Sequence, residues 1–207
     1  MPDGRRARGD RSRDLALRSG VGLATEHGLD GFSLAELADE TGLSKAGIAS
    51  LFGTKHELQL AIVERAREQL DERVFRPVRA AEPGLDRLTT LGTAWIDHLA
   101  DPELRGGCFF AAASFELDAR PGPLHDLVAA DMDRWIRSIA RMLADGRDRG
   151  ELRADLDADD EAFALFAIGI TANTMIQLGG AGDPAGRARR VWRRHLDRLL
   201  PIQEAGT

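Results

Sequence analysis

The sequence has a single cysteine, Cys108, and no uninterrupted hydrophobic run long enough for a clear membrane span. One cysteine excludes an internal disulfide framework and fits a reducing cytosol, so we expect a cytoplasmic protein. Cys108 stands beside Phe109 and Phe110 and is read as a small buried hydrophobe. The most apolar run, 162–180, is interrupted by threonine, asparagine and glutamine. We therefore expect a buried helix there.

The motifs of the common enzyme classes are also missing. The chain has no G-x-S-x-G, no phosphate loop ending in Gly-Lys-Ser/Thr and no H-E-x-x-H. Its histidines are scattered without metal-ligand spacing, so neither a metal nor another cofactor is expected. The acidic run 155–161 suggests a calcium loop but lacks the required glycine, and Phe166 stands where the bidentate glutamate belongs. A small helical enzyme is therefore only a remote alternative.

The charge that is present is unevenly distributed. The net charge is −6, and 151–161 is strongly acidic. Arginines nevertheless crowd the N-terminus as a basic arm: Arg5, Arg6, Arg8, Arg11 and Arg13. Such an arm is usually a solvated tail, and it gains functional meaning only if a nucleic-acid-binding unit follows it.

The apolar residues recur at three- and four-residue spacing, and no alternating strand pattern is found. The sequence therefore predicts an all-α fold of about nine helices. Ser33 with Glu36, and Thr54 with Glu57, have the spacing of capping boxes. The expected helices cover about 11–27, 33–41, 44–52, 54–79, 85–100, 108–119, 124–149, 159–178 and 185–200.

The helix expected at 44–52 is unusually bare. Gly47 lies in its interior, where glycine costs roughly 1 kcal/mol relative to alanine. Ile48, Leu51 and Phe52 fall on one side and can dock on the two preceding helices. The other side carries only Lys45, Ala46, Ala49 and Ser50. A packed side and a bare side after a tight turn indicate a helix-turn-helix, whose second helix enters the DNA major groove.

Residues 11–60 resemble the TetR family of transcriptional regulators. The matching features are the glycine hinge before Phe32 and Ser33, the Gly-Leu-Ser-Lys of 42–45, Phe52, and the Thr-Lys that opens the next helix. The segment 105–126 also resembles part of the ligand-binding half in a subgroup of these proteins. The resemblance implies an N-terminal arm and DNA-binding domain at 1–53. It also implies a regulatory ligand-binding and dimerisation domain at 54–207, with helix 54–79 linking the two.

The resemblance also implies which residues contact DNA. Ser33 and Lys55 would meet phosphates, and Ser44 and Lys45 would meet phosphate or base. The sequence departs from the family at Gly47 and Ala49, where members commonly carry Thr and Tyr, and at Ser50. Either the operator sequence is recognised mainly through Lys45 and through DNA shape, or the arginine arm supplies the missing contacts in the minor groove. Lys45 and Lys55 can also be plain surface cations. The predicted DNA-binding set is Ser33, Ser44, Lys45, Ala46, Gly47, Ala49, Ser50, Thr54 and Lys55.

The C-terminal half suggests a pocket and a dimer interface. A helix that is apolar all round must be covered all round, so one side of 159–178 should meet a second subunit. The predicted interface is Leu165, Ile168, Ile176, Val191, Trp192, Leu196 and Leu199. The predicted apolar ligand pocket is Trp95, Phe109, Phe110, Phe115, Met132, Trp135, Phe163, Phe166, Asn173 and Gln177. Each aromatic side chain can equally be core packing, and Asn173 and Gln177 can equally bridge to the backbone or to the partner.

Together these features predict a DNA-binding transcriptional regulator, most simply a repressor, that binds a palindromic operator as a homodimer. The family mechanism implies that a small, largely apolar effector wedges between inner helices and spoils the spacing of the two reading helices. One alternative keeps the DNA-binding half but makes the C-terminal half a dimerisation or protein-interaction module that binds no ligand.

Overall fold

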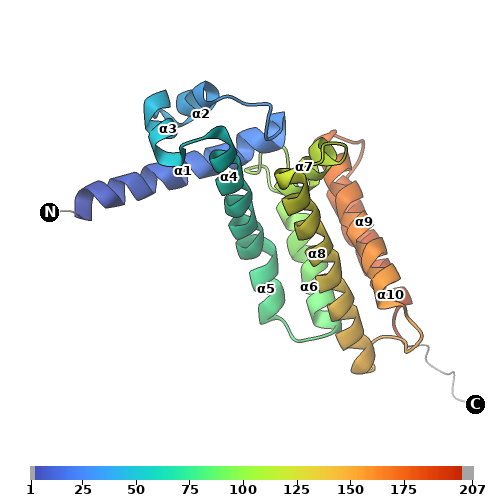
Figure 1. The fold of residues 1–207 in the computed structure, drawn as a ribbon. Helices are drawn as coiled ribbons and strands as arrows, with labels where there is room; N and C mark the ends of the chain where they lie inside the picture. Colours follow the sequence, from blue (N-terminus) through green and yellow to red (C-terminus); the bar gives the residue numbers. More distant parts are fainter. Residues whose placement is uncertain (1–2, 202–207) are drawn as a thin grey trace, which may run out of the picture. The chain divides into compact units, whose positions relative to one another are not determined.

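The computed structural model describes residues 3–201, with side chains from Arg6 onward, and every regular element in that part of the chain is helical (Figure 1). The helical stretch 55–80 runs without a break through α4, a π-helical turn η1 and α5, so the described residues form nine continuous helices. The predicted all-α fold is confirmed. The elements are α1 (Asp3–His27), α2 (Leu34–Thr41), α3 (Lys45–Phe52), α4 (Lys55–Leu70), η1 (Asp71–Phe75), α5 (Arg76–Ala80), α6 (Leu85–Ala100), α7 (Phe109–Leu117), α8 (Pro123–Asp148), α9 (Ala158–Gln177) and α10 (Pro184–Arg198).

Two of the predicted helix starts are confirmed, and the predicted start of the first helix is wrong. Ser33 and Glu36 form the predicted capping box, and Thr54 and Glu57 form the second one. The predicted start of the first helix at residue 11 is wrong, because α1 already begins at Asp3. The segment 3–10 holds four good helix formers, Arg5, Arg6, Ala7 and Arg8, which favour a continued helix although Gly4 and Gly9 oppose it. The predicted basic arm from Arg6 to Arg13 is therefore helical, whereas the side chain of Arg5 lies outside the described residues.

The chain forms two compact units. Unit 1 contains α1 to α4 together with Glu103–Asp126, and unit 2 contains Asp71–Pro102 and the chain from Leu127 onward. This division differs from the predicted domains, because the segment around α7 joins the N-terminal helices. Arg105 forms ion pairs with Glu26 of α1 and Glu40 of α2, and α7 packs on α1.

Unit 1 has a core that holds the N-terminal helices together. Ala16 of α1, Leu37 of α2 and Ile48 of α3 are fully buried, and so is Ile62 of α4. Because these side chains come from four different elements, burying them fixes the short helices α2 and α3 against the two longer ones.

In unit 2, α6, α9 and α10 pack side by side (Figure 1). The indole Nε1 of Trp192 on α10 donates to the carbonyl oxygen of Leu88 on α6, at 3.0 Å. Gly92 makes this possible, because a Cβ atom there would lie 2.3 Å from the Trp192 Nε1. Trp95 lies in the same core, with its ring centroid 4.3 Å from that of Trp135.

The structure corrects part of the predicted dimer interface. Four of the predicted residues are buried within their own chain, namely Leu165, Trp192, Leu196 and Leu199. The remaining three, Ile168, Ile176 and Val191, are half-buried or exposed. The buried side of α9 is centred on Leu165, Phe166 and Gly169, and a Cβ atom at Gly169 would lie 2.2 Å from the Trp95 ring. α6 can approach α9 closely only on the side that carries Gly169, so that side is buried. Hydrophobic periodicity could not predict this, because α9 is apolar on all sides.

Within residues 3–201, no helix combines the length and apolar character that crossing a lipid bilayer requires.

Candidate nucleic-acid interface

The two short helices of unit 1 are joined by a tight turn. α2 ends at Thr41 and is capped by Gly42, whose φ of 68° is left-handed. Ser44 then caps α3 by accepting a hydrogen bond from the Gly47 amide at 3.0 Å. Ile48 and Phe52 are buried on the inner side of α3. This is the geometry of a helix-turn-helix, in which α3 is the second helix.

The outer side of α3 is bare, as the sequence predicts. Lys45, Ala46, Ala49 and Ser50 are exposed, and Gly47 is half-buried beside them. Methyl groups and a hydroxyl keep the helix surface narrow, so a groove about 12 Å wide can admit it closely. Lys45 is the one charged residue of this helix, and Lys45 and Lys55 are the only lysines of the whole chain.

Two N-cap hydroxyls have protons available for a ligand. The Ser33 hydroxyl accepts from the Glu36 amide at 3.2 Å, and the Ser44 hydroxyl accepts from the Gly47 amide. In the described part of the chain, no acceptor takes the proton of either hydroxyl, so each can donate to a phosphate oxygen. Thr54 differs, because its hydroxyl already donates to Glu57 Oε2 at 2.8 Å.

The carboxylates of the capping boxes are held in the ionised form. The amide of Ser33 donates to Glu36 and lowers the pKa of that carboxyl below its ordinary value of 4.5. The amide of Thr54 lowers the pKa of Glu57 in the same way. Both carboxylates therefore stabilise the helix starts at neutral pH, because the first turn of a helix favours negative charge.

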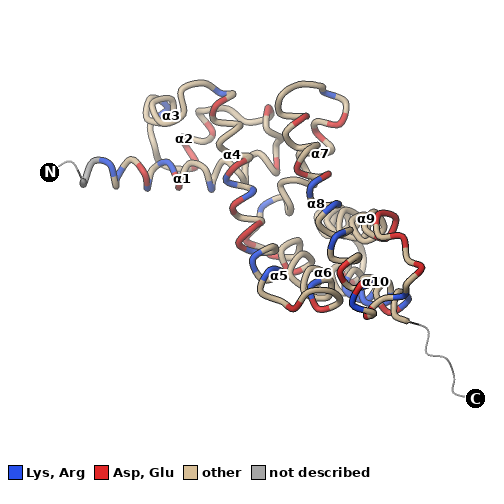
Figure 2. Tube along the Cα trace, turned by 60° about the horizontal axis from the view of Figure 1, so that its bottom comes forward, with Lys and Arg blue, Asp and Glu red and all other residues tan. Residues whose placement is uncertain are grey.

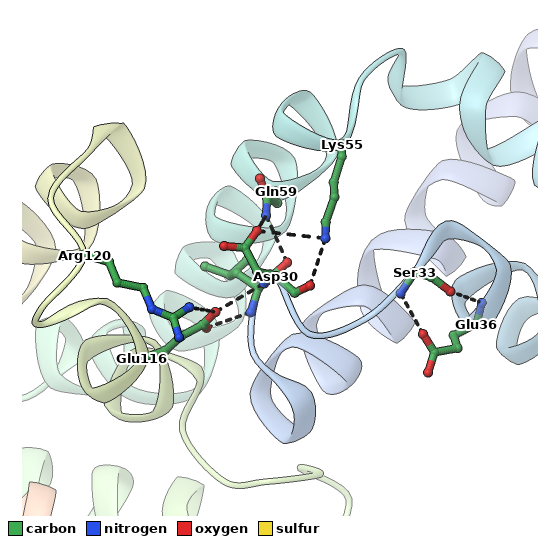
Figure 3. A network of polar contacts seen from close by, with 8 residues as sticks. Asp30, Ser33, Glu36, Lys55, Gln59, Glu116 and Arg120 are labelled. Carbon is green, nitrogen blue, oxygen red and sulfur yellow. Dashed lines mark hydrogen bonds and ion pairs between the residues drawn. The ribbon is translucent and has the colours of Figure 1, made fainter.

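Lys55 lies in a polar network around the loop between α1 and α2 (Figure 3). Its Nζ atom donates to the Asp30 carbonyl at 2.9 Å and lies 3.9 Å from the Asp30 carboxylate. The buried amide of Gln59 donates to the Leu29 carbonyl and to the same carboxylate, at 3.0 and 2.7 Å. The ammonium of Lys55 is therefore held in place while its side chain remains half exposed.

Glu116 of α7 completes this network (Figure 3). Its carboxylate accepts from the amides of Leu29 and Asp30, at 2.7 and 3.2 Å. Gly28 allows the approach, because its φ is 89° and a Cβ atom there would lie 2.9 Å from the carboxyl group. The sequence analysis missed Glu116, since a lone glutamate 87 residues from Leu29 carries no local signal.

The N-terminal arginines lie along α1, where single aspartates stand between groups of arginines (Figure 2). Arg6, Arg8 and Arg11 are exposed. An α-helix with its side chains is about 10–12 Å wide, whereas the minor groove is about 6 Å wide. In this conformation the helix is too wide to insert into the minor groove.

The predicted pocket residues are divided between the two units. Trp95, Trp135 and Phe166 pack together in unit 2, whereas Phe109 and Phe110 form an edge-to-face pair in unit 1. The side chains of Phe115 and Phe163 are 60% and 67% exposed. Of the other three, Asn173 is buried, Met132 is half-buried and Gln177 is exposed.

Known proteins share this architecture. A relative from Bacillus subtilis (strain 168), the uncharacterized HTH-type transcriptional regulator YezE, is 23% identical over 73% of this chain and 78% of its own length. A TetR transcriptional regulator from Chloroflexus aurantiacus J-10-FL superposes with a TM-score of 0.84 at 25% identity, over 94% of this chain and 98% of that chain. A cysteine-substituted mutant of the regulator CifR, complexed with a 26-base-pair operator duplex, superposes with a TM-score of 0.70 at 22% identity, over 91% and 96% of the two chains.

Two family models match the sequence itself. The model of the bacterial regulatory proteins of the tetR family matches residues 16–62, which include the helix-turn-helix. The model of the tetracyclin repressor-like C-terminal domain matches residues 84–192, more than half of the chain. The chain therefore belongs to the TetR family of transcriptional regulators.

Proposed function

We propose that this regulator is a repressor that binds a palindromic operator as a homodimer and is released by a small, largely apolar ligand. It would act in the cytoplasm, where bacterial operator DNA lies. The main support is the outer side of α3, which is exposed and nearly free of bulk while Ile48 and Phe52 anchor its inner side. Two such helices must meet successive major grooves about 34 Å apart, so the proposal requires a twofold pair of chains.

The proposed contacts divide into base reading and phosphate binding. Lys45 and Ser50 supply polar groups toward base edges, while Ala46, Gly47 and Ala49 let the helix axis approach. Because this surface carries only one charged residue, we propose that the protein recognises its operator largely through DNA shape.

Phosphate binding is proposed for four residues at the starts of α2, α3 and α4. The free protons of the Ser33 and Ser44 hydroxyls suit phosphate oxygens. Lys55 can keep its bond to the Asp30 carbonyl and still donate to a phosphate, because an ammonium has three N–H groups. Thr54 would have to give up its bond to Glu57.

For the dimer we propose the exposed side of α9, supplemented by α10. Phe163, Ala167, Thr171 and Met175 are exposed at every fourth position, and Val191 of α10 is also exposed. A hollow of about 310 Å³ lies between the two helices and is lined by Ile168, Met175 and Val191, among others. The exposed fractions of Phe163, Met175 and Val191 are 67%, 44% and 43%, so burial against a second copy would remove substantial apolar surface from water.

The ligand is proposed to contact the aromatic cluster of unit 2. The indole nitrogens of Trp95 and Trp135 are buried and have no hydrogen-bond partner among the described residues. Buried indole N–H groups usually have a partner, so this pair favours a ligand that is mostly apolar and carries an acceptor.

Selection of bound sequences from random double-stranded DNA by the full-length protein tests the operator proposal. We expect enrichment of one inverted repeat. Enrichment of an unrepeated sequence, or of none, would contradict it. For the ligand, a panel of apolar metabolites should raise the melting temperature, since a hundredfold excess over Kd adds about 2.7 kcal/mol. A panel without any stabilising compound would favour a C-terminal half that only dimerises.

A further inference from the structure

Unit 2 contains a second hollow that the proposed function does not use. It measures about 620 Å³ and lies where the π-helical turn η1 and α5 run beside α6 (Figure 1). Its wall includes Arg73 of the π-helical turn and, from α6 and the residue after it, Thr89, Thr93, Asp97, His98 and Asp101. Isolated π-helical turns inside α-helices occur frequently at functional sites.

The charges in this wall are already compensated. The guanidinium of Arg73 forms an ion pair with Asp101, and Asp97 forms one with Arg189 of α10. The remaining surface of the hollow is mainly apolar, with Pro77 and Ala94 contributing to it. An ion would therefore have to disrupt an existing pair, whereas an uncharged molecule would not.

The hollow is lined by Thr89, Thr90 and Thr93, and the hydroxyls of Thr89 and Thr93 can serve a ligand as acceptors. Thr89 donates its proton to the Leu85 carbonyl at 2.9 Å, and Thr93 donates to the Thr89 carbonyl at 3.1 Å. A hydroxyl that has donated its proton still has lone pairs. Both oxygens can therefore accept a hydrogen bond from a bound molecule.

His98 adds an unsatisfied polar group. The residue is 7% exposed, and its Nδ1 atom is buried with no hydrogen-bond partner in the part of the chain that the structure describes. Burial, with Arg73 as a second cause, lowers the pKa of His98 to about 4. The imidazole is therefore neutral at neutral pH and has one nitrogen that accepts a hydrogen bond.

We propose that this hollow binds a small uncharged molecule with an apolar body and a hydroxyl donor, such as an alcohol or a phenol. The hydroxyl proton would be accepted by the neutral imidazole of His98, and the apolar body would cover Pro77 and Ala94. This site differs from the proposed aromatic ligand site, because it is built from other residues of α6 and includes the π-helical turn.

The test compares phenol with anisole, which has the same ring but no hydroxyl proton, in the full-length protein with ¹⁵N-labelled histidine. We expect phenol to shift the ring nitrogen signals of His98, which a His98→Gln spectrum assigns, and anisole to leave them in place. His98→Phe, which removes the acceptor, should weaken phenol binding roughly fivefold, the usual effect of one hydrogen bond, and should leave anisole binding unchanged.

Three results would overturn the proposal: no shift with phenol, an equal shift with anisole, or a larger shift with choline or benzoate, which carry opposite charges. Because no DNA is present in this experiment, its failure would leave the proposed operator binding untouched.

Discussion

The guanidinium of Arg13 lies 4.6 Å from the centroid of the Phe52 ring, and its Nη1 atom donates to the Leu51 carbonyl at 2.8 Å. One arginine of α1 thus holds the C-terminal end of α3. The contact is favourable on two counts, since a cation stacks on an aromatic face and also meets the negative end of a helix. Arg13, which the sequence analysis grouped with the basic arm, has a structural role that its neighbours Arg8 and Arg11 do not share.

We expect Arg13→Met to lower the free energy of unfolding by roughly 1–2 kcal/mol, because it removes the stacking and the hydrogen bond together. Urea denaturation of the purified protein measures this. Arg18→Met is the control, since Arg18 makes only an exposed ion pair with Asp14, of a kind worth at most about 1 kcal/mol. Equal losses for the two variants would show that Arg13 does not anchor α3.

Lys45→Ala and Lys55→Ala should each weaken operator binding and reduce the salt dependence of the binding constant by about one unit, because each removes one cation from the surface proposed to face DNA. Fluorescence anisotropy with the selected operator at several salt concentrations gives the slope. Arg141→Ala, at an exposed position of α8, should leave it unchanged. A wild-type slope in either lysine variant would refute that contact.

Gly47→Leu should abolish operator binding, because the added bulk lies on the flank of the bare surface of α3. The fold should survive, since leucine favours a helix more than glycine does by up to about 1 kcal/mol. Part of that gain will be offset, because a Cβ atom at this position lies 3.1 Å from the Ser44 hydroxyl of the cap. Circular dichroism checks the fold, and unimpaired operator binding would mean that another surface reads the DNA.

Phe163→Arg should convert the dimer to a monomer, because it places a charge at the most exposed aromatic residue of the proposed apolar interface. Light scattering after size-exclusion chromatography measures the mass. Ala130→Arg, at an exposed position of α8, is the matched control and should leave the mass unchanged. A dimer that persists with Phe163→Arg would remove this side of α9 from the interface.

His98 should make stability fall in mild acid. Its pKa is about 4 in the folded protein and 6.5 without the burial, so between these values the unfolded chain binds a proton that the folded chain does not. The free energy of unfolding therefore falls by about 2 kcal/mol between about pH 7.5 and pH 5. His98→Gln should show a pH dependence smaller by that amount, whereas His56→Gln, at an exposed position, should match the wild type. Identical curves for His98→Gln and the wild type would contradict the assignment.

Family membership makes this chain a DNA-binding regulator and not an enzyme. The residues that led to this expectation were local ones. Ser33 with Glu36 and Thr54 with Glu57 are three positions apart and satisfy each other within one helical turn, so their geometry follows from spacing. The bare side of α3 was also predictable, because Ile48 and Phe52 define its inner side by periodicity alone.

The contacts that the sequence analysis missed join residues that are far apart in the sequence. Glu116 binds the Leu29 amide, Arg105 joins Glu26 to Glu40, and Arg13 stacks on Phe52, yet in each case the two residues are far apart in the sequence. The buried side of α9 was misjudged because Leu165 and Phe163 are equally apolar.

The sequence by itself therefore determined most of the helices, the two capping boxes and the narrow outer side of α3, since each depends on residues within a few positions of one another. Tertiary structure alone decided which side of α9 is buried, where the segment around α7 belongs and which arginine anchors α3. Those choices depend on shape and on hydrogen-bond partners that meet only when distant segments pack, as Gly169 does against the Trp95 ring.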